Sequence, residues 1–267
     1  MNERHEFPAG VPCWVEGLHR DCAAARDFYG PLMGWEFEGS GGEPEYFVAR
    51  LGGREVAGLA PMPEQVQRID GIWMTHVAVD SAAATAEAVT AAGGEVAAGP
   101  MDLPPAGTLV VIHDPEGAVF CAWEPEGRAG AEAINEPGAW AMSTLVTGDP
   151  ARADAFYKAL FGWNAEPFGP PEANVGLYRL PGYVGGTPTQ PVPRDVVAVR
   201  MPLQEGNPRW DVGFWIPDAE AAAAQAAELG GRVVQAPHDV PPFKEAVLSD
   251  PQGGTFSVSQ LVVPPPG

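Results

Sequence analysis

Two periods of apolar residues alternate along this chain, the period of a helix and the period of a strand. Residues 25–32 place apolar side chains at i, i+3, i+4 and i+7, which predicts a helix, although Pro31 weakens its last turn. The same stripe returns over residues 153–160, where Asp149 suits the helix N-cap and Pro150 the first helical position. Short alternating segments follow both helices and predict strands.

The rest of each half repeats this order. A strand is predicted at residues 72–79, and a helix follows over residues 82–92, with Ser81 as its cap and Gly93 and Gly94 at its end. Further strands are predicted at 13–17, 45–51, 95–98, 108–113, 118–123, 175–180 and 210–216. The chain is therefore predicted to contain four units, each made of a strand, a helix and three strands.

Two motifs show that the chain is a duplication. The segment 26–35, with Phe-Tyr in its helix and Gly-Trp at its end, returns at 154–163, which is 128 positions later. The segment 113–120, which contains Asp-Pro-Glu-Gly, returns at 249–256, now 136 positions later. The larger offset predicts about eight extra residues in the second copy, between 182 and 208. We expect one domain over residues 1–130 and another over residues 131–267, with the linker inside 125–137.

Composition and charge exclude several classes of protein. The chain has 15 basic and 35 acidic side chains, a net charge of −20, so nucleic-acid binding and attachment to anionic membranes are not expected. Three cysteines favour a reducing compartment over a disulfide framework. No signal-like or membrane-spanning apolar run occurs. We expect a cytoplasmic protein, and the sequence leaves monomer and homodimer open.

The four-unit pattern, with its Phe-Tyr helix ending in Gly-Trp and its Asp-Pro-x-Gly turn, resembles the vicinal oxygen chelate superfamily. That group includes glyoxalase I, bleomycin-resistance proteins and extradiol dioxygenases, and the resemblance extends over nearly the whole chain. It is strongest to the tandem two-domain actinobacterial branch of glyoxalase-like proteins and hydroxylases. The resemblance implies an α+β fold of four βαβββ modules, paired into two domains whose open sheets form cups around a ligand.

Metal-using members of this superfamily carry His, Gln or Glu at fixed strand positions. The resemblance places Trp14, Met74 and Cys121 at these positions in the first domain, and Met142, Asp211 and Ser257 in the second. Trp and Met do not suit Mg²⁺, Mn²⁺ or Fe²⁺, which prefer oxygen and nitrogen ligands. We therefore expect no metal ion and no other cofactor, and we expect these six residues to contact the ligand instead.

Strand alternation places Glu16 and His76 two residues beyond Trp14 and Met74, facing the same cup. A carboxyl and an imidazole in one cavity can act as an acid–base pair or as a shifted metal dyad. A structural hydrogen-bonded pair, or two residues that never meet, are alternatives. The second domain has Thr144 and Gly213 at these places, so such chemistry would belong to the first domain.

Tryptophan is frequent, with eight residues in 267. Alternation places Trp14 and Trp123 on the cup face, where Trp and Met suit a flat aromatic ligand. The alternative is that these rings only fill the core, which is the role we expect for Trp35 and Trp163. His19 lies in a segment that reads as a loop, and we expect it to be solvated.

The leading hypothesis is metal-independent binding of a hydrophobic, aromatic small molecule. The resemblance to drug-binding proteins implies antibiotic sequestration or an accessory role in natural-product biosynthesis. The alternative is an enzyme, either a glyoxalase-like lyase or a hydroxylase or isomerase that uses Glu16 and His76. The sequence does not decide whether the protein is an enzyme.

Overall fold

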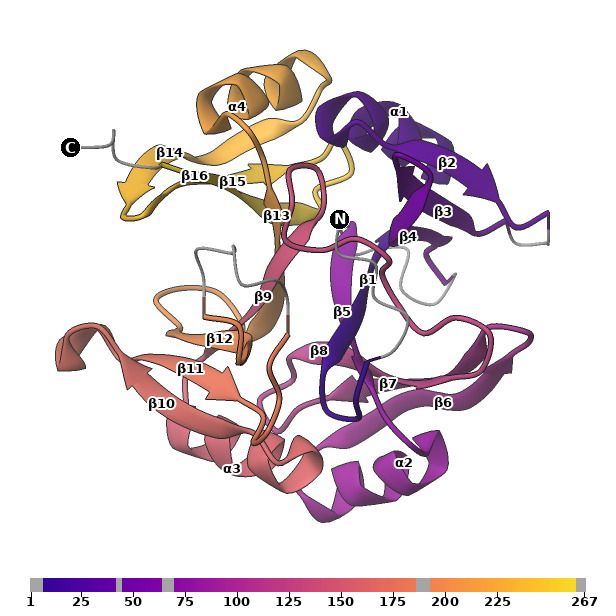
Figure 1. Ribbon diagram of the computed structural model, residues 1–267, viewed down its shortest axis with the longest axis vertical. Coiled ribbons are helices and arrows are strands. Elements are labelled where there is room, and N and C mark those ends of the chain that lie inside the picture. The colour runs from indigo at the N-terminus through magenta and orange to yellow at the C-terminus, as the bar shows by residue number, and fades with distance from the viewer. Residues whose placement is uncertain (1–6, 42–44, 64–69, 186–192, 263–267) are drawn as a thin grey trace.

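The computed structural model describes residues 7–41, 45–63, 70–185 and 193–262. These residues form two eight-stranded mixed sheets, one before and one after the linker, with a pair of helices for each sheet (Figure 1). The fold is α+β, as predicted. None of the described helices is long and apolar enough to cross a membrane.

The strands of each sheet follow one another in the chain. The first sheet contains β1 (Pro12–His19), β2 (Glu36–Gly39), β3 (Phe47–Leu51), β4 (Arg54–Pro61), β5 (Ile72–Ala78), β6 (Glu95–Leu103), β7 (Gly107–His113) and β8 (Val119–Pro125). The second contains β9 (Trp140–Thr147), β10 (Asn164–Phe168), β11 (Val175–Arg179), β12 (Val196–Pro202), β13 (Arg209–Trp215), β14 (Arg232–Val240), β15 (Phe243–Ser249) and β16 (Thr255–Leu261).

Each sheet joins two modules through its central strands. The first has the order β2-β3-β4-β1-β5-β8-β7-β6, and the second has the order β10-β11-β12-β9-β13-β16-β15-β14. In the first sheet, β1 and β5 pair antiparallel, while β1 pairs parallel with β4, and β5 with β8. The first strand of every module therefore lies at the centre of a sheet, where its side chains have neighbours on both sides.

The helices begin at the caps that the sequence indicates. They are α1 (Cys22–Met33), α2 (Ala82–Ala91), α3 (Pro150–Phe161) and α4 (Ala219–Glu228), and a 3-10 turn, η2 (Pro171–Ala173), follows β10. The side chains of Ser81 and Asp149 each accept a hydrogen bond from the backbone N–H three residues later, at Ala84 and Arg152, so both predicted caps are confirmed. Both Phe-Tyr helices end at a glycine with φ of 74°, Gly34 and Gly162, a conformation that glycine adopts without strain.

The extra residues of the second copy lie between β11 and β12. Only Gly52 and Gly53 separate β3 from β4, whereas residues 180–195 separate β11 from β12. This connection overlaps the predicted range of 182–208 but begins two residues earlier, and residues 186–192 lie outside the described part. The insertion thus gives the second domain a long loop that the first domain lacks at this position.

The two repeated motifs contact each other across the domains. Helix α1 contacts α4, and α2 contacts α3 (Figure 1). The Tyr29 hydroxyl donates to Asp250 at 2.9 Å, and the Tyr157 hydroxyl donates to Asp114 at 3.0 Å. Each Phe-Tyr helix therefore bonds the Asp-Pro-x-Gly turn of the other copy, and this reciprocal pairing holds the two halves together.

The Gly-Trp ends of the helices also anchor across the copies. Trp35 Nε1 donates to the carbonyl of Gly138 at 2.6 Å, and Trp163 Nε1 donates to that of Gly10 at 2.7 Å. Both indoles are buried, which confirms their predicted role in the core. Each ring therefore has a hydrogen-bond partner for its one polar atom.

The prediction for His19 is wrong. His19 ends strand β1 and is fully buried, with Nε2 2.7 Å from the Oδ2 atom of Asp250. The residues that follow His19 are polar because β1 ends there, and in the sequence such a strand end resembles a solvent-exposed loop. In the structure, Asp250 of the second domain covers this end of β1. His19 therefore belongs to the interdomain contact.

Candidate functional site

The predicted site residues of the first domain share one face of the sheet. Trp14 pairs with His76 and Glu16 pairs with Met74 between the antiparallel strands β1 and β5, and Cys121 on β8 pairs with His76. Residues in register on neighbouring strands point to the same side. We call this surface the first-domain face; it consists of Trp14, Glu16, Met74, His76, Cys121 and Trp123.

The first-domain face is filled by its own side chains. The exposed fraction is 4% for Trp14 and 7% for Trp123, and Cys121 is fully buried. Arg128 of the linker lies over the Trp14 ring at 5.5 Å, and its carbonyl accepts a hydrogen bond from Trp123 Nε1 at 2.8 Å. The linker therefore covers both rings in this structure.

Glu16 lies in a hydrogen-bonded group that its sequence neighbours do not indicate. The hydroxyl of Tyr46 bonds the Glu16 carboxyl and accepts a hydrogen bond from Trp14 Nε1 at 3.1 Å. Burial raises the pKa of Glu16 from 4.5 to about 7, and Tyr46 and the Arg128 charge offset only part of this effect. The Glu16 carboxyl can therefore gain or lose a proton near neutral pH.

Gly58 makes room for this group. It lies opposite Glu16 on β4, and a Cβ atom at this position would overlap the Tyr46 hydroxyl and lie 3.1 Å from Trp14 Nε1. The hydrogen bonds between Tyr46, Trp14 and Glu16 thus depend on the absence of a side chain at residue 58.

Gly58→Ala is expected to lower the free energy of unfolding by about 1–3 kcal/mol, because Tyr46 must move away from Glu16. Urea denaturation would measure the change. Gly30→Ala is a matched control inside helix α1, where the new Cβ has ordinary contacts, the nearest at 3.4 Å. The gain in helix propensity is opposed by Pro31, which disfavours a helical residue with a Cβ before it, so the net change should stay below about 1 kcal/mol. A loss of the same size in both variants would contradict the proposed role of Gly58.

His76 is buried and neutral. Its exposed fraction is 3%, and burial lowers its pKa from 6.5 to about 3. Its Nε2 atom has no hydrogen-bond partner within the described ranges. Glu16 and His76 are diagonal neighbours across β1 and β5, an arrangement with a Cα separation of roughly 7–8 Å. The two side chains therefore lie close together, and the His76 Nε2 atom is a buried polar atom without a partner among the described residues.

The first-domain residues at the metal-ligand positions do not fit a hard divalent cation. Burial raises the pKa of the Cys121 thiol well above its ordinary value, and its Sγ atom lies 3.9 Å from Met74 Sδ. The indole nitrogen of Trp14 is a donor and is already bonded to Tyr46. In the part of the chain that the structure describes, no group of three or more His, Cys, Asp or Glu side chains is arranged to hold a metal ion.

The equivalent face of the second domain is more open and more polar. Met142, Asp211 and Ser257 are all partly exposed. Met142 pairs with Gly213, which in turn pairs with Ser257, while Asp211 pairs with Thr144. Burial raises the pKa of Asp211, and Arg209, at 3.0 Å, offsets part of that shift. The structure therefore brings these residues together on one face, as it does in the first domain.

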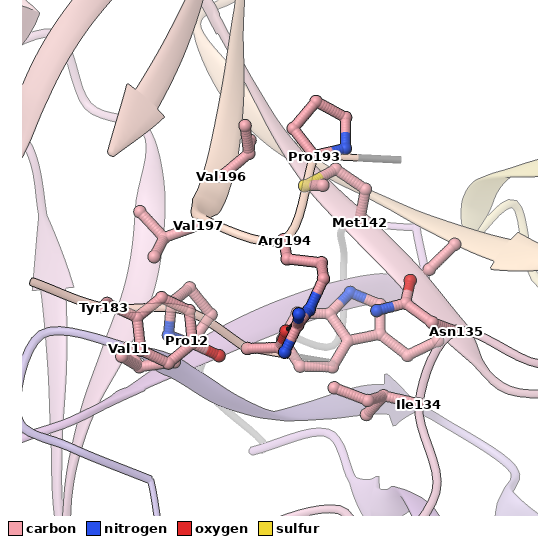
Figure 2. Close-up of a pocket in the computed structure, with 13 residues that line it drawn as sticks. Val11, Pro12, Ile134, Asn135, Met142, Tyr183, Pro193, Arg194, Val196 and Val197 are labelled. Atoms are coloured by element: carbon pink, nitrogen blue, oxygen red, sulfur yellow. Dashed lines mark hydrogen bonds between the residues drawn. The ribbon is translucent and has the colours of Figure 1, made fainter. Parts of the chain in front are cut away.

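A hollow of about 50 Å³ lies beside Met142 (Figure 2). Its walls come from the start of β1, the linker, the start of β9 and the connection between β11 and β12. We call it the Trp140 hollow; its lining includes Val11, Ile134, Asn135, Trp140, Met142, Tyr183, Arg194 and Val197. Figure 2 shows Arg194 extending between Val11, Pro12 and Tyr183 on one side and Asn135 on the other.

Sequence reasoning missed four residues of these two places. They are Tyr46, Arg128, Trp140 and Arg194. Tyr46, Arg128 and Arg194 lie in loops, so strand alternation from the metal-ligand positions does not reach them. Trp140 precedes Met142 by two residues, and the alternation rule could have included it. Tyr46 and Arg128 carried no such signal.

Two sheets, each built from a pair of βαβββ modules, define the vicinal oxygen chelate fold. The structure is similar to the Mn(II)-bound glyoxalase from Novosphingobium aromaticivorans, with a TM-score of 0.63 and 16% identity over 96% of this chain and 83% of that one. It is also similar to the 2,3-dioxygenase LapB from Pseudomonas sp. KL28, with a TM-score of 0.62 and 13% identity over 97% and 96% of the two chains.

A family model described as "Glyoxalase-like domain" matches residues 15–123 and 128–259, so the chain belongs to the glyoxalase-like domain family. It is 37% identical to the "Putative glyoxylase CFP32" of Mycobacterium bovis over 97% of both chains. It is 33% identical to the "Anthracycline biosynthesis protein DnrV" of Streptomyces peucetius over 96% of this chain and 94% of that relative.

Proposed function

We propose that the protein binds a planar aromatic small molecule without a metal ion, at the face of the second domain. The Trp140 hollow carries this proposal, because it combines aromatic and apolar walls with a partly exposed floor at Met142. Aromatic and apolar side chains with a few polar groups are typical of small-molecule sites. Two features support the metal-independent part: Met142 does not suit a hard divalent cation, and Asp211 belongs to no group of three or more His, Cys, Asp or Glu side chains arranged around a metal ion in the described part of the chain.

The relatives indicate the biological setting. One is named for anthracycline biosynthesis, and this supports an accessory role in making or sequestering an aromatic antibiotic. Three free cysteines, two of them buried, support a cytoplasmic location. We keep the expectation that neither nucleic acid nor a membrane is a partner, since the net charge is −20.

Calorimetric titration with naphthalene-1-carboxamide, a neutral planar probe, tests the proposal. We expect saturable binding to the wild type and about a tenfold loss of affinity in Met142→Lys, because a charge beside the hollow disfavours an apolar ring. Met201→Lys makes the same change at an exposed position of β12 and should bind as the wild type does. Absence of binding to the wild type, or equal loss in both variants, would refute the proposal.

A second candidate function is acid–base catalysis at the first-domain face. It is favoured by Glu16, whose pKa of about 7 suits proton transfer at neutral pH, and by the unpartnered Nε2 of His76. In this role Glu16 takes a proton from the substrate, and neutral His76 hydrogen-bonds an oxygen of the substrate. The name of the mycobacterial relative supports an oxo-aldehyde adduct as the substrate.

The hemithioacetal of methylglyoxal and glutathione is the probe for this second function. Turnover by the wild type, with a loss of about a hundredfold or more in Glu16→Gln and in His76→Ala, is expected if both residues act. Unchanged turnover in the two variants would exclude this pair. Elemental analysis of protein purified without chelator would show whether a stoichiometric metal ion accompanies any activity.

A further inference from the structure

Part of the wall of the Trp140 hollow comes from residues in which the two copies differ. In the first domain, Gly52 and Gly53 make a tight turn between β3 and β4. In the second domain, the longer connection between β11 and β12 contributes Tyr183, Gly185, Pro193 and Arg194 to the wall of the hollow. Trp140 also has no aromatic counterpart in the first copy, where Pro12 stands 128 positions earlier. Among the described residues, the wall that this longer connection and Trp140 provide therefore belongs to the second half of the duplication.

One wall of the hollow contains a buried donor without a partner. Trp140 is 5% exposed, and its Nε1 atom has no hydrogen-bond partner among the residues that the structure places. The four other tryptophans with an anchoring role described above all donate their indole N–H, at distances of 2.6–3.1 Å. A buried N–H without an acceptor is unfavourable, so a ligand oxygen within reach of Trp140 Nε1 would supply the missing hydrogen bond.

The positively charged side chain of Arg194 lines the same hollow. Its Nε atom donates to the carbonyl of Gly185 at 2.8 Å, which fixes the plane of the guanidinium group. Asn135 also lines the hollow; its Oδ1 accepts from Trp215 Nε1 at 3.2 Å, which leaves the amide NH₂ as its donor group.

We propose that the Trp140 hollow binds the carboxylate of an aromatic acid. Trp140 Nε1 and the Arg194 guanidinium donate to the carboxylate oxygens, and the ring of the acid lies against Met142, Val197 and Tyr183. A volume of about 50 Å³ has room for a group of a few heavy atoms, since one water needs about 10–15 Å³, so the carboxylate enters the hollow and the ring packs at its rim. This inference rests on the proposed function and names the class of ligand.

A preference for an anionic ligand is unexpected for a chain with a large negative net charge. A protein with a net charge of −20 repels anions at long range. Binding of a carboxylate therefore requires a local cation in a site with little water, where charge-assisted hydrogen bonds are strongest. Arg194 meets this requirement, and the repulsion from the rest of the protein should make the affinity depend on salt.

Calorimetric titration with naphthalene-1-carboxylate, beside naphthalene-1-carboxamide, tests the inference at about pH 7.5. The carboxylate should bind with one site per chain and about tenfold more tightly than the amide. Arg194→Gln and Trp140→Phe should each lose about tenfold in affinity for the carboxylate and little for the amide. Trp140→Phe removes the indole N–H and keeps an aromatic ring in the wall of the hollow. Arg152→Gln is the matched control for the lost charge: it removes an exposed arginine from α3 and should change neither affinity.

Equal binding of the two probes, or unchanged carboxylate affinity in both variants, overturns this inference and leaves the proposed aromatic binding intact. Absence of binding by either probe overturns both proposals. Circular dichroism shows whether each variant is folded. Arg194→Gln replaces a partly exposed side chain and should fold normally, so the inference can be tested even if Trp140→Phe does not fold.

Discussion

Replacement of Asp250 with alanine is expected to lower the free energy of unfolding by about 3–5 kcal/mol at neutral pH, because it removes an acceptor shared by several buried donors. Its Oδ2 atom lies 2.7 Å from His19 Nε2 and 2.9 Å from the Tyr29 hydroxyl. Its Oδ1 atom accepts the backbone N–H groups of Gln252 and Gly254. Without the carboxylate, these buried groups lose their partners, and the contact between the two domains weakens.

Chemical denaturation of Asp250→Ala and Asp114→Ala provides the comparison. Asp114 accepts the Tyr157 hydroxyl and two backbone N–H groups in the same way, but Thr147 stands where His19 stands in the first copy. We expect Asp114→Ala to cost less than Asp250→Ala. An equal or larger cost at residue 114 would show that His19 adds nothing to the contact.

The contribution of Asp250 should depend on pH in a defined direction. Burial opposes ionisation of Asp250, but the hydrogen bonds from His19, Tyr29 and Gly254 outweigh it and lower the pKa below its ordinary value of 3.8. A carboxyl with a lowered pKa stabilises the folded state above the unfolded pKa and loses that effect as the pH falls through the folded pKa. The difference between wild type and Asp250→Ala should therefore shrink below about pH 4.

Glu16→Gln is expected to stabilise the protein by about 3 kcal/mol near pH 8 and to have little effect near pH 4. Folding raises the pKa of Glu16 from 4.5 to about 7, so the folded state holds this proton more tightly than the unfolded chain does. Stability is then full below about pH 4.5 and falls as the pH rises towards 7. Glutamine keeps the size of the side chain without the charge.

Denaturation curves of the wild type and Glu16→Gln between about pH 4 and pH 8 would measure this difference. Glu36→Gln makes the same change at an exposed position of β2 and should shift stability by less than about 0.5 kcal/mol throughout. If Glu16→Gln gave no gain at high pH, the carboxyl would be ionised at little cost in the folded protein, and its suggested role in proton transfer would lose its support.

A buried carboxyl that destabilises the protein at neutral pH is more typical of a functional site than of a structural pair. The first-domain face contains such a group beside an unpartnered His76, although linker residue Arg128 covers its rings. The second-domain face has the open hollow and the cation instead. The two copies of the duplication have therefore diverged in chemistry while keeping the same strand order.

Much of the fold was predictable because its signals are local. The caps at Ser81 and Asp149 and the helical stripes depend on residues within one or two turns, and the structure confirms them. The shared face of Glu16 and His76 was also predictable, since strand alternation and the equivalence of the modules set it. His19 was predicted wrongly, because the group that buries it, Asp250, is 231 positions away.

The sequence by itself determined the duplication, the four modules, the acidic surface and the change of residue type at the metal-ligand positions. Only the tertiary structure decided that Tyr29 meets Asp250 across the copies, that Tyr46 bonds Glu16, and that the loop between β11 and β12 makes a hollow at Trp140. The reason is physical. Helix and strand periods reflect contacts between near neighbours, whereas burial, pKa and the shape of a site depend on side chains that come together only when both sheets are packed.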